Sequence, residues 1–452
     1  MTKKKRIASL LLAFVLALGL TACGGGGGSG GDDGSSGGNT SAPEPSTGGT
    51  ASGTTDGVTL TLMGNANDLA HNYMQDIFQQ YETATGNKLD IVALEGSNFN
   101  TVATSKFATG DIPDLFMNFN DANLNNYDVP NNFYYMNDEV WVSDLTEGAK
   151  AYCQDADGNI LGLPFWESSV SGCYYNKTIL DQLGLKPATN QAEFDKLCQD
   201  ITDAGYTALL WPAGGGCNWM YQFALDPVFA DDPALLEKLN KNEVTYADIP
   251  EVQKMVEWVK MAADKGWFGD SYLTDGWNDI SPVMGTGEAV MVLIWDTWFY
   301  TDLDEGNDYT KADFALMPVF MGTCDEGTYE GGNLNMMMAN KNSDKLDAAL
   351  EFIRFCAEPE HYNHAFDGVS TVSCFKGQTT NIQSDMVTNA IESVEALQRT
   401  STANPKILGY TQNETGSAIQ ELMLGNVDAA GCVKLMDDYR IASAKALGAP
   451  GF

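Results

Sequence analysis

The strongest constraint on the fold is an alternation of strand and helix patterns that begins at Val58. Residues 58–63 alternate apolar and polar side chains, as a half-buried strand does. From Leu69 to Tyr81, large apolar residues then recur every four positions, which is the spacing of an amphipathic helix. Three further segments continue the series: a strand at 89–94, a helix at 99–107 and a strand at 114–117. This β-α-β-α-β order predicts an α/β fold with a largely parallel sheet.

The later part of the chain carries the same two kinds of pattern. Ala289 to Trp295 is almost wholly apolar over the length of a strand, which suits a strand buried on both faces. Two more strands are expected at Phe314–Phe320 and Leu334–Ala339. Helical periodicity is found at 194–201, 252–259 and 346–353.

The N-terminus has the pattern of an export signal. A positive stretch at 3–6 precedes an uncharged apolar stretch, Ile7 to Leu20, which is too short to span a bilayer. Leu20-Thr21-Ala22-Cys23 resembles a bacterial lipobox, and a plain secretion signal with an incidental cysteine is the alternative. We expect a lipoprotein signal peptide at 1–22 and a lipid on Cys23 that anchors the protein to the outer face of the bacterial cell membrane. The Gly/Ser-rich composition of residues 23–57 predicts a flexible tether.

Charge and metal-binding residue types exclude several classes of partner. The 61 acidic and 25 basic residues give a net charge of −36, which opposes binding to nucleic acid and to anionic membrane surfaces. With only three histidines and no C-x-x-C motif, we expect no zinc site, no other metal and no cofactor. Asp155-x-Asp157-x-Asn159 hints at a calcium loop but lacks its Gly and Glu, so a hairpin is favoured. Most of the eight cysteines after Cys23 are expected to be buried free thiols, although disulfides stay possible.

Several motifs occur in an order that resembles one protein family. Residues 106–116 contain G-x-x-P-D, residues 158–164 end in G-L-P, and residues 174–189 begin with Y-Y-N-K. Residues 284–291 read M-G-T-G-E-A-V-M, and a helix at 346–353 follows later. Over about 58–452 the chain resembles the extracellular solute-binding proteins (family 1) of sugar ABC transporters, a group that includes maltose-binding protein.

The resemblance implies a two-lobed periplasmic-binding-protein-like fold of type II, with hinge-connected lobes and a ligand cleft. We expect the chain to cross between lobes near Glu167–Val170, Asp313–Met317 and Pro359–Phe366. Lobe 1 is then 58–167 plus 314–361, and lobe 2 is 168–313 plus 362–452. The implied function is that of a monomeric binding protein, not an enzyme, which delivers a carbohydrate, such as an oligosaccharide, to ABC transporter permease subunits.

A sugar site needs aromatic rings to stack on C–H faces and polar groups to bond hydroxyls. Such residues fall in loops and at strand ends, where α/β folds bind ligands. The candidates are Asn65, Asn118, Asn120, Asp121, Trp166, Glu167, Asn218, Trp219, Trp295, Asp296 and Asn333. The resemblance implies that Asp121 bonds sugar and that Asn118 replaces an aromatic residue.

Each candidate also has a structural alternative. The Asn/Asp group of 118–121 could be a solvated turn, Trp166 could pack in a hinge, and Glu167 could be a surface charge. Whether Trp295 or Trp298 takes the binding role stays open, while Trp258 and Trp267 are expected to be helix packing. A glycoside hydrolase, a structural surface lipoprotein and a binder of cationic solutes such as polyamines remain alternatives, and the Asn/Trp-rich loops favour neutral sugar.

Overall fold

A computed structural model describes most of the chain after residue 56. The described residues are 57–95, 99–120, 122–155, 157–214, 219–330, 334–399, 406–410, 412–446, 448–449 and 451–452. The predicted signal peptide, Cys23 and the tether lie outside them. The candidate residues Asp121, Asn218 and Asn333 also lie outside them.

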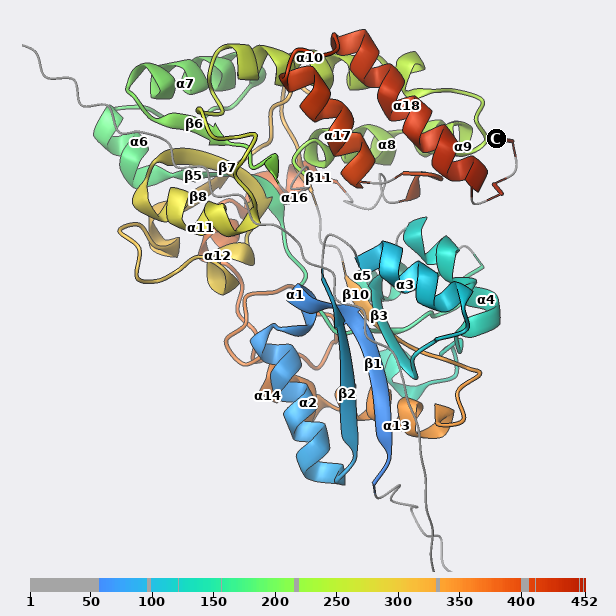
Figure 1. Ribbon diagram of the computed structural model, residues 1–452. Coiled ribbons are helices and arrows are strands. Elements are labelled where there is room, and N and C mark those ends of the chain that lie inside the picture. The colour runs from blue at the N-terminus through green and yellow to red at the C-terminus, as the bar shows by residue number, and fades with distance from the viewer. Residues whose placement is uncertain are drawn as a thin grey trace, which may run out of the picture. The chain divides into compact units, whose positions relative to one another are not determined.

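The first sheet has five strands in the order β2-β1-β3-β10-β4 (Figure 1). Its strands are β1 (Thr59–Asn65), β2 (Lys88–Leu94), β3 (Leu115–Phe119), β4 (Leu163–Pro164) and β10 (Asn335–Ala339). Strand β1 pairs in parallel with β2 and β3, as the alternation predicted. Strand β10 runs antiparallel to β3 and β4, so the sheet is mixed.

The helices of this part follow the predicted pattern with one interruption. The helices are α1 (Ala66–Leu69), α2 (Asn72–Thr85), α3 (Phe99–Ala108), α4 (Val129–Asn132), α5 (Glu147–Tyr152), α13 (Leu346–Cys356) and α14 (Pro359–Ala365). The predicted helix from Leu69 is divided in two, because the chain leaves helical geometry at His71, where φ is −58° and ψ is 141°. Helix α2 ends at Gly86, whose φ of 75° is readily adopted only by glycine.

Asp114, in the P-D motif, joins three segments of this part. Its Oδ2 accepts hydrogen bonds from Thr61 N and Oγ1 at 2.8 and 2.9 Å. Its Oδ1 accepts one from Ser343 Oγ at 2.5 Å, and Lys345 Nζ lies 3.3 Å from Oδ2. The motif therefore fastens β1 and the start of β3 to the residues that precede α13.

The second sheet has six strands, ordered β11-β9-β5-β7-β6, with β8 also paired to β5. The strands are β5 (Ser171–Asn176), β6 (Thr207–Leu210), β7 (Ala289–Trp295), β8 (Phe314–Met317), β9 (Tyr329–Glu330) and β11 (Gln398–Arg399). Strand β7 has the predicted bounds, and its first six residues are buried. It runs antiparallel to β5 and parallel to β6.

Helices surround this second sheet, and α17 and α18 lie side by side (Figure 1). They are α6 (Lys177–Leu183), α7 (Gln191–Asp203), α8 (Gln222–Asp231), α9 (Pro233–Asn240), α10 (Pro250–Asp264), α11 (Trp277–Thr286), α12 (Trp298–Thr301), α15 (Asp385–Asn389), α16 (Ile391–Leu397), α17 (Gln412–Met423) and α18 (Ala429–Ala446). Asn176 and Asn190 cap α6 and α7, because their side-chain oxygens accept backbone N–H groups of the first turn.

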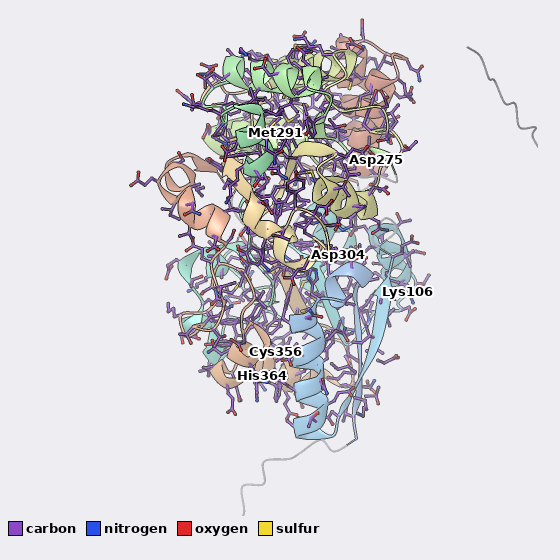
Figure 2. All side chains as sticks on the ribbon, turned by 90° about the vertical axis from the view of Figure 1, so that its left-hand side faces the viewer. Lys106, Asp275, Met291, Asp304, Cys356 and His364 are labelled. Carbon is purple, nitrogen blue, oxygen red and sulfur yellow. The ribbon has the colours of Figure 1, made fainter. Side chains whose placement is uncertain are left out.

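Two separate apolar cores accompany the two sheets. Cys356 belongs to the first core and Met291 to the second, and both lie inside the packed side chains (Figure 2). The chain passes from the first core to the second between Phe165 and Val170, close to the first predicted crossing. There Val372 N donates a hydrogen bond to Ser168 O at 3.0 Å.

The other two crossings differ from their predicted positions. Strand β8 pairs with β5, and residues 319–329 pack in the second core, although 314–361 was assigned to lobe 1. Phe366, Cys374 and Phe375 pack in the first core, although 362–452 was assigned to lobe 2. The division into lobes stays a prediction, and we propose crossings near 331 and 376 in place of 314 and 361.

Seven cysteines are free in the described part of the chain, and all but Cys324 are buried, in line with the prediction. Burial raises the pKa of the Cys173, Cys198 and Cys356 thiols. Gln154 and Ile160 form an antiparallel bridge, so the Asp155–Asn159 segment is a hairpin. Within the described residues, no group of three metal-ligating side chains occurs, and no helix has the length and apolarity needed to cross a membrane.

Candidate functional site

Four segments of the first sheet meet at one edge. Strands β1 and β3 end there, at Asn65 and Phe119, because parallel strands have their carboxyl ends on the same side. Strand β10 begins there, since Asn335 pairs with Phe119. Strand β4 also leaves there, because Pro164 pairs with Met336. Residues that follow these strand ends are therefore brought together.

Asp68 and Asn335 form the first polar pair at this edge. Asn335 Nδ2 donates a hydrogen bond to Asp68 Oδ2 at 2.9 Å. Burial raises the pKa of Asp68 to about 7, and the hydrogen bond from Asn335 opposes the shift. Asn335 is 1% exposed, and its Oδ1 has no hydrogen-bond partner among the described residues.

Glu167 is the second acidic group at this edge. Its side chain is 6% exposed, and its Oε1 lies 3.6 Å from Nδ1 of His71. Burial raises the pKa of Glu167 well above its usual range, and the negative charges of Asp302, Asp296 and Asp68 raise it further. Burial also lowers the pKa of His71, although Asp302 opposes that shift. The second carboxyl oxygen, Oε2, has no hydrogen-bond partner within the described chain.

Aromatic rings surround Trp166, which is partly exposed. Its ring centroid lies 5.2 Å from that of His71, 6.1 Å from Tyr73 and 5.6 Å from Phe119. All three pairs are edge-to-face, with interplanar angles of 77°, 77° and 83°. These contacts fix the indole and leave part of its surface open, as a stacking platform requires.

A second aromatic group lies at the end of β7 in the second sheet. The Trp219 ring lies 6.2 Å from Trp295 and 5.1 Å from Trp277, and Phe223 lies 5.3 Å from Trp295. Trp219 is 4% exposed and donates its Nε1 hydrogen to Leu293 O at 3.2 Å. Trp295 and Trp277 are only partly buried, so they are the members able to meet a ligand.

Two carboxylates accompany this second group. Trp277 Nε1 donates a hydrogen bond to Asp302 Oδ1 at 3.2 Å. The charge of Asp302 acts on both His71 and Glu167, which connects the two aromatic groups electrostatically. Burial raises the pKa of Asp296 to about 7, and backbone hydrogen bonds, including one from Val170, oppose the shift. The set thus combines partly exposed indoles with carboxyl oxygens, which is the chemistry of a polyhydroxylated ligand.

Three predicted residues have structural partners here. Asn65 caps α1, because its Oδ1 accepts the Asn67 N–H at 3.0 Å. Asn120 Nδ2 donates to the backbone oxygens of Tyr152 and Gln154. Asn118 is 3% exposed; its Oδ1 accepts the Phe119 N–H at 2.8 Å, whereas its Nδ2 has no partner in the described structure.

Other tryptophans belong to the interior. Trp298 is 3% exposed, Trp258 5% and Trp267 0%, so all three pack in the second core. Burial therefore favours Trp295 over Trp298 as the ligand-facing residue. Trp258 and Trp267 pack as predicted.

Sequence reasoning missed Asp68, His71, Tyr73, Trp277, Asp302 and Asn335. The available signal was the neighbourhood of a strand end in the first sheet: Asn335 begins β10, and Asp68 and His71 follow the end of β1 at Asn65 within one short helix and a turn. Trp277 and Asp302 carry no such signal, because each lies beside a helix, at the start of α11 and the end of α12.

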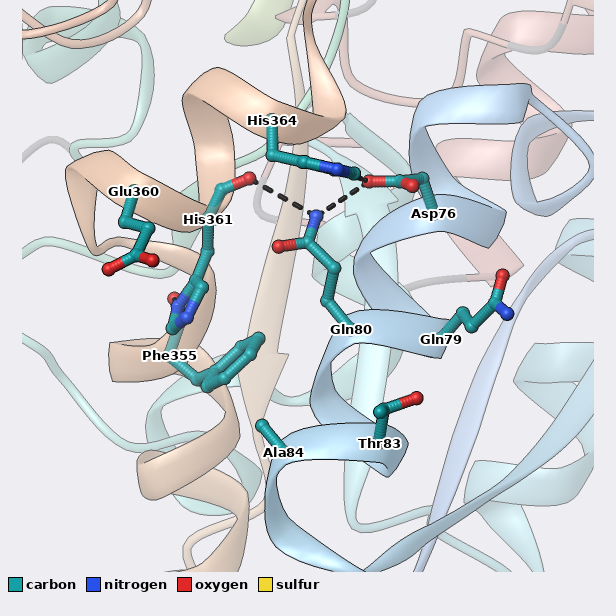
Figure 3. A pocket seen from close by; sticks show the side chains of 9 residues that line it. All are labelled: Asp76, Gln79, Gln80, Thr83, Ala84, Phe355, Glu360, His361 and His364. Carbon is teal, nitrogen blue, oxygen red and sulfur yellow. Dashed lines mark hydrogen bonds and ion pairs between the residues drawn. The ribbon is translucent and has the colours of Figure 1, made fainter.

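A separate pocket of about 490 Å³ lies between α2 and α14 (Figure 3). There His364 Nδ1 lies 2.8 Å from Asp76 Oδ2, and Gln80 donates to the same oxygen at 2.6 Å. Glu360 and His361 also line it. None of the predicted site residues lines this pocket.

Comparison with protein families identifies the family of this chain. The model for "Bacterial extracellular solute-binding protein" matches residues 45–362. Among curated proteins, the melibiose/raffinose/stachyose-binding protein MelE of Bacillus subtilis (strain 168) is 22% identical over 297 residues. That match covers 64% of this chain and 67% of the relative.

Solved structures show the same fold. A chitin oligosaccharide binding protein has a TM-score of 0.72 and 21% identity, with 86% of this chain and 100% of that chain covered. The solute-binding protein RafE in complex with raffinose has a TM-score of 0.71 and 15% identity, with the same two coverages. These similarities confirm the two-lobed fold of type II periplasmic binding proteins.

Proposed function

The chain belongs to the family of bacterial extracellular solute-binding proteins, and from this premise we propose that it captures an oligosaccharide for an ABC importer. One observation carries the choice of ligand. Two groups of aromatic side chains, around Trp166 and around Trp295, lie at the ends of the two sheets. Glu167 accompanies the first group and Asp302 the second, and the charge of Asp302 acts on Glu167. Indole faces stack on sugar C–H surfaces, and carboxylates accept hydroxyl hydrogens. Relatives named for melibiose, raffinose, stachyose and chitin oligosaccharides support the same class.

The proposed site combines residues from both sheets. Trp166 and Glu167 come from the first crossing, Trp295 from β7, Asp68 from α1, and His71 from the N-cap position of α2. Asn118, Asn335 and Asp302 add polar groups. Asp121, Asn218 and Asn333 stay in the proposal on the sequence argument alone. Binding is proposed without catalysis.

A thermal-shift screen with mono-, di- and oligosaccharides tests the function, because ligands of the native state raise the melting temperature by mass action. Calorimetry on the best ligand then compares Trp166→Ala and Trp295→Ala with Glu360→Gln as the control, since Glu360 lines the separate pocket. We expect losses of roughly 5- to 150-fold in the tryptophan variants, equal to about 1–3 kcal/mol of stacking. If no saccharide shifts the melting temperature, the proposal fails.

The site of action is proposed to be the outer face of the cell membrane, with a lipid on Cys23. The lipobox-like residues 20–23 and the Gly/Ser-rich tether motivate this. Cys23→Ala should release the folded part from the membrane fraction or leave an uncleaved precursor. Continued lipid labelling of that variant would contradict the anchor. The protein is proposed to act as a monomer that presents its sugar to permease subunits.

A further inference from the structure

The carboxyl groups at the proposed site outnumber the basic groups that face them. Asp68, Glu167, Asp296 and Asp302 act on one another or on His71. They come from α1, the first crossing, the end of β7 and the end of α12. A neutral sugar gives such a cluster hydroxyl donors but no positive charge, and without one each carboxyl is costly to ionise beside the others.

Glu167 shows directly that one partner is missing. Its side chain is 6% exposed, and its Oε2 accepts no hydrogen bond within the described chain. A buried acceptor without a partner is destabilising, and more so when it is charged. His71 is the basic group beside it, but its ring lies 3.6 Å from the other oxygen, Oε1, and burial lowers its pKa.

From these observations we propose that the bound saccharide carries a protonated amino group, which Glu167, Asp68 and Asp302 receive. The inference rests on the proposed function and narrows its substrate class to amino-bearing saccharides. An ammonium group offers three hydrogen-bond donors and a positive charge, so it donates to Oε2 of Glu167 and offsets one negative charge of the cluster. The indoles of Trp166 and Trp295 remain free to stack on the sugar rings.

Proton release accompanies this binding. Burial and like charges raise the pKa of Glu167, and burial raises that of Asp68 to about 7, so the protonated forms of both are favoured over those of ordinary carboxyls before the ligand arrives. A cation at hydrogen-bond distance favours the charged carboxylates, and these protons leave. The titratable groups that face the site are Asp68, His71, Tyr73, Glu167, Asp296 and Asp302.

The test uses matched pairs of saccharides that differ only in carrying amino groups in place of hydroxyls, four in the chitosan tetramer and one in each of the other two. A chitosan tetramer with cellotetraose, galactosamine with galactose, and amino-deoxy-raffinose with raffinose provide three such pairs. In every pair with measurable binding, we expect the amino member to bind at least about tenfold more tightly near pH 7, or about 1.4 kcal/mol. That advantage should shrink with added salt. The binding enthalpy measured by calorimetry should differ between phosphate and Tris buffers for the amino member alone, because only its binding releases protons to the buffer.

Two variants identify the residues involved. Glu167→Gln keeps the side-chain volume and should remove most of the amino preference, measured as the ratio of the two dissociation constants within each pair. Asp302→Asn changes an exposed group, so it tests the same idea without risk to the fold. Glu360→Gln, in the separate pocket, is the control that should behave as the parent.

Three results would overturn the inference. Equal or tighter binding of the neutral member in each binding pair removes the amino preference and leaves the proposed function intact. Tighter binding of spermidine than of any saccharide assigns the carboxylates to a polyamine. Absence of binding by every member of all pairs and of the wider saccharide screen rejects the inference together with the proposed function.

Discussion

Val170 and Asp296 are joined by two hydrogen bonds where the chain enters the second sheet. Val170 N donates to Asp296 Oδ1 at 2.7 Å, and Asp296 N donates to Val170 O at 3.0 Å. Asp296 was predicted to bind ligand, but its Oδ1 already holds the backbone of the first crossing. Asp296 therefore holds the backbone of Val170 at the first crossing, where we expect the chain to bend when the lobes close.

Asp296→Ala should destabilise the unliganded protein. The change leaves the buried Val170 N–H without an acceptor, which costs about 1–3 kcal/mol. Asp296→Asn keeps the Oδ1 acceptor and should melt much closer to the parent. Differential scanning calorimetry without ligand separates the two variants. Equal melting of all three proteins would rule out a structural role for this carboxyl.

The unliganded protein should lose stability as pH rises through neutrality. Burial raises the pKa of Asp68 and Asp296 to about 7, whereas an unfolded Asp titrates near about 3.9. The folded state binds these protons more tightly, so their stabilising effect is complete at low pH and is lost as pH rises through about 7. Melting curves between about pH 5.5 and pH 8 measure the trend. The double variant Asp68→Asn/Asp296→Asn should flatten this trend. An unchanged slope would assign the trend to other groups, such as Glu167, or to the net charge of −36.

Asp114 should show the opposite dependence on pH. Burial raises its pKa, but hydrogen bonds from Ser343 and Thr61 and the contact with Lys345 outweigh burial, so its pKa lies below the ordinary value. Its contribution is present above the unfolded pKa and is lost as pH falls through the folded pKa. Asp114→Ala should cost about 3 kcal/mol at neutral pH, judged from hydrogen bonds to a charged acceptor. Urea unfolding at about pH 7 and pH 3 should show the difference narrowing in acid.

Trp219 and Trp295 should respond differently to truncation. Trp219 is buried and bonded to Leu293 O, so Trp219→Ala should lower unliganded stability by about 3–5 kcal/mol. Trp295 is only partly buried, so Trp295→Ala should weaken saccharide binding with a smaller loss of stability. Calorimetric titration paired with unliganded melting distinguishes the roles. A larger stability loss in Trp295→Ala than in Trp219→Ala would reverse this assignment.

Ligand binding should reduce the radius of gyration, because hinge closure in a two-lobed fold needs only a few residues per crossing. Small-angle scattering with and without a saturating saccharide measures this. The saccharide used is the one that raises the melting temperature most in the thermal-shift screen. An unchanged radius would argue against closure.

The sequence predicted the individual elements better than their partners. The apolar run Ala289–Trp295 is a strand with those bounds, because complete burial leaves a continuous local pattern. The segment at 314 was also predicted as a strand, but nothing in its local pattern says which sheet it joins, and it pairs with β5.

The site shows the same limit. Trp166 and Glu167 were predicted from their place at the first crossing, and Asn333 was predicted two positions before Asn335, which bonds Asp68. His71 and Asp302 are far apart in sequence and interact only because the chain folds back across the crossings. An interaction of this kind depends on the tertiary structure, so no local pattern in the sequence predicts it.

The seven unpaired thiols have a consequence for handling and for export. In the native state, six of them are shielded from oxidants, so folding outside the cytoplasm requires no disulfide-forming catalyst for the described part of the chain. Heating exposes these sulfurs to one another and to air, and mispaired crosslinks can then trap the denatured chain. Reversible melting therefore depends on a reductant in the buffer, because burial in the native fold is what keeps these thiols from oxidation.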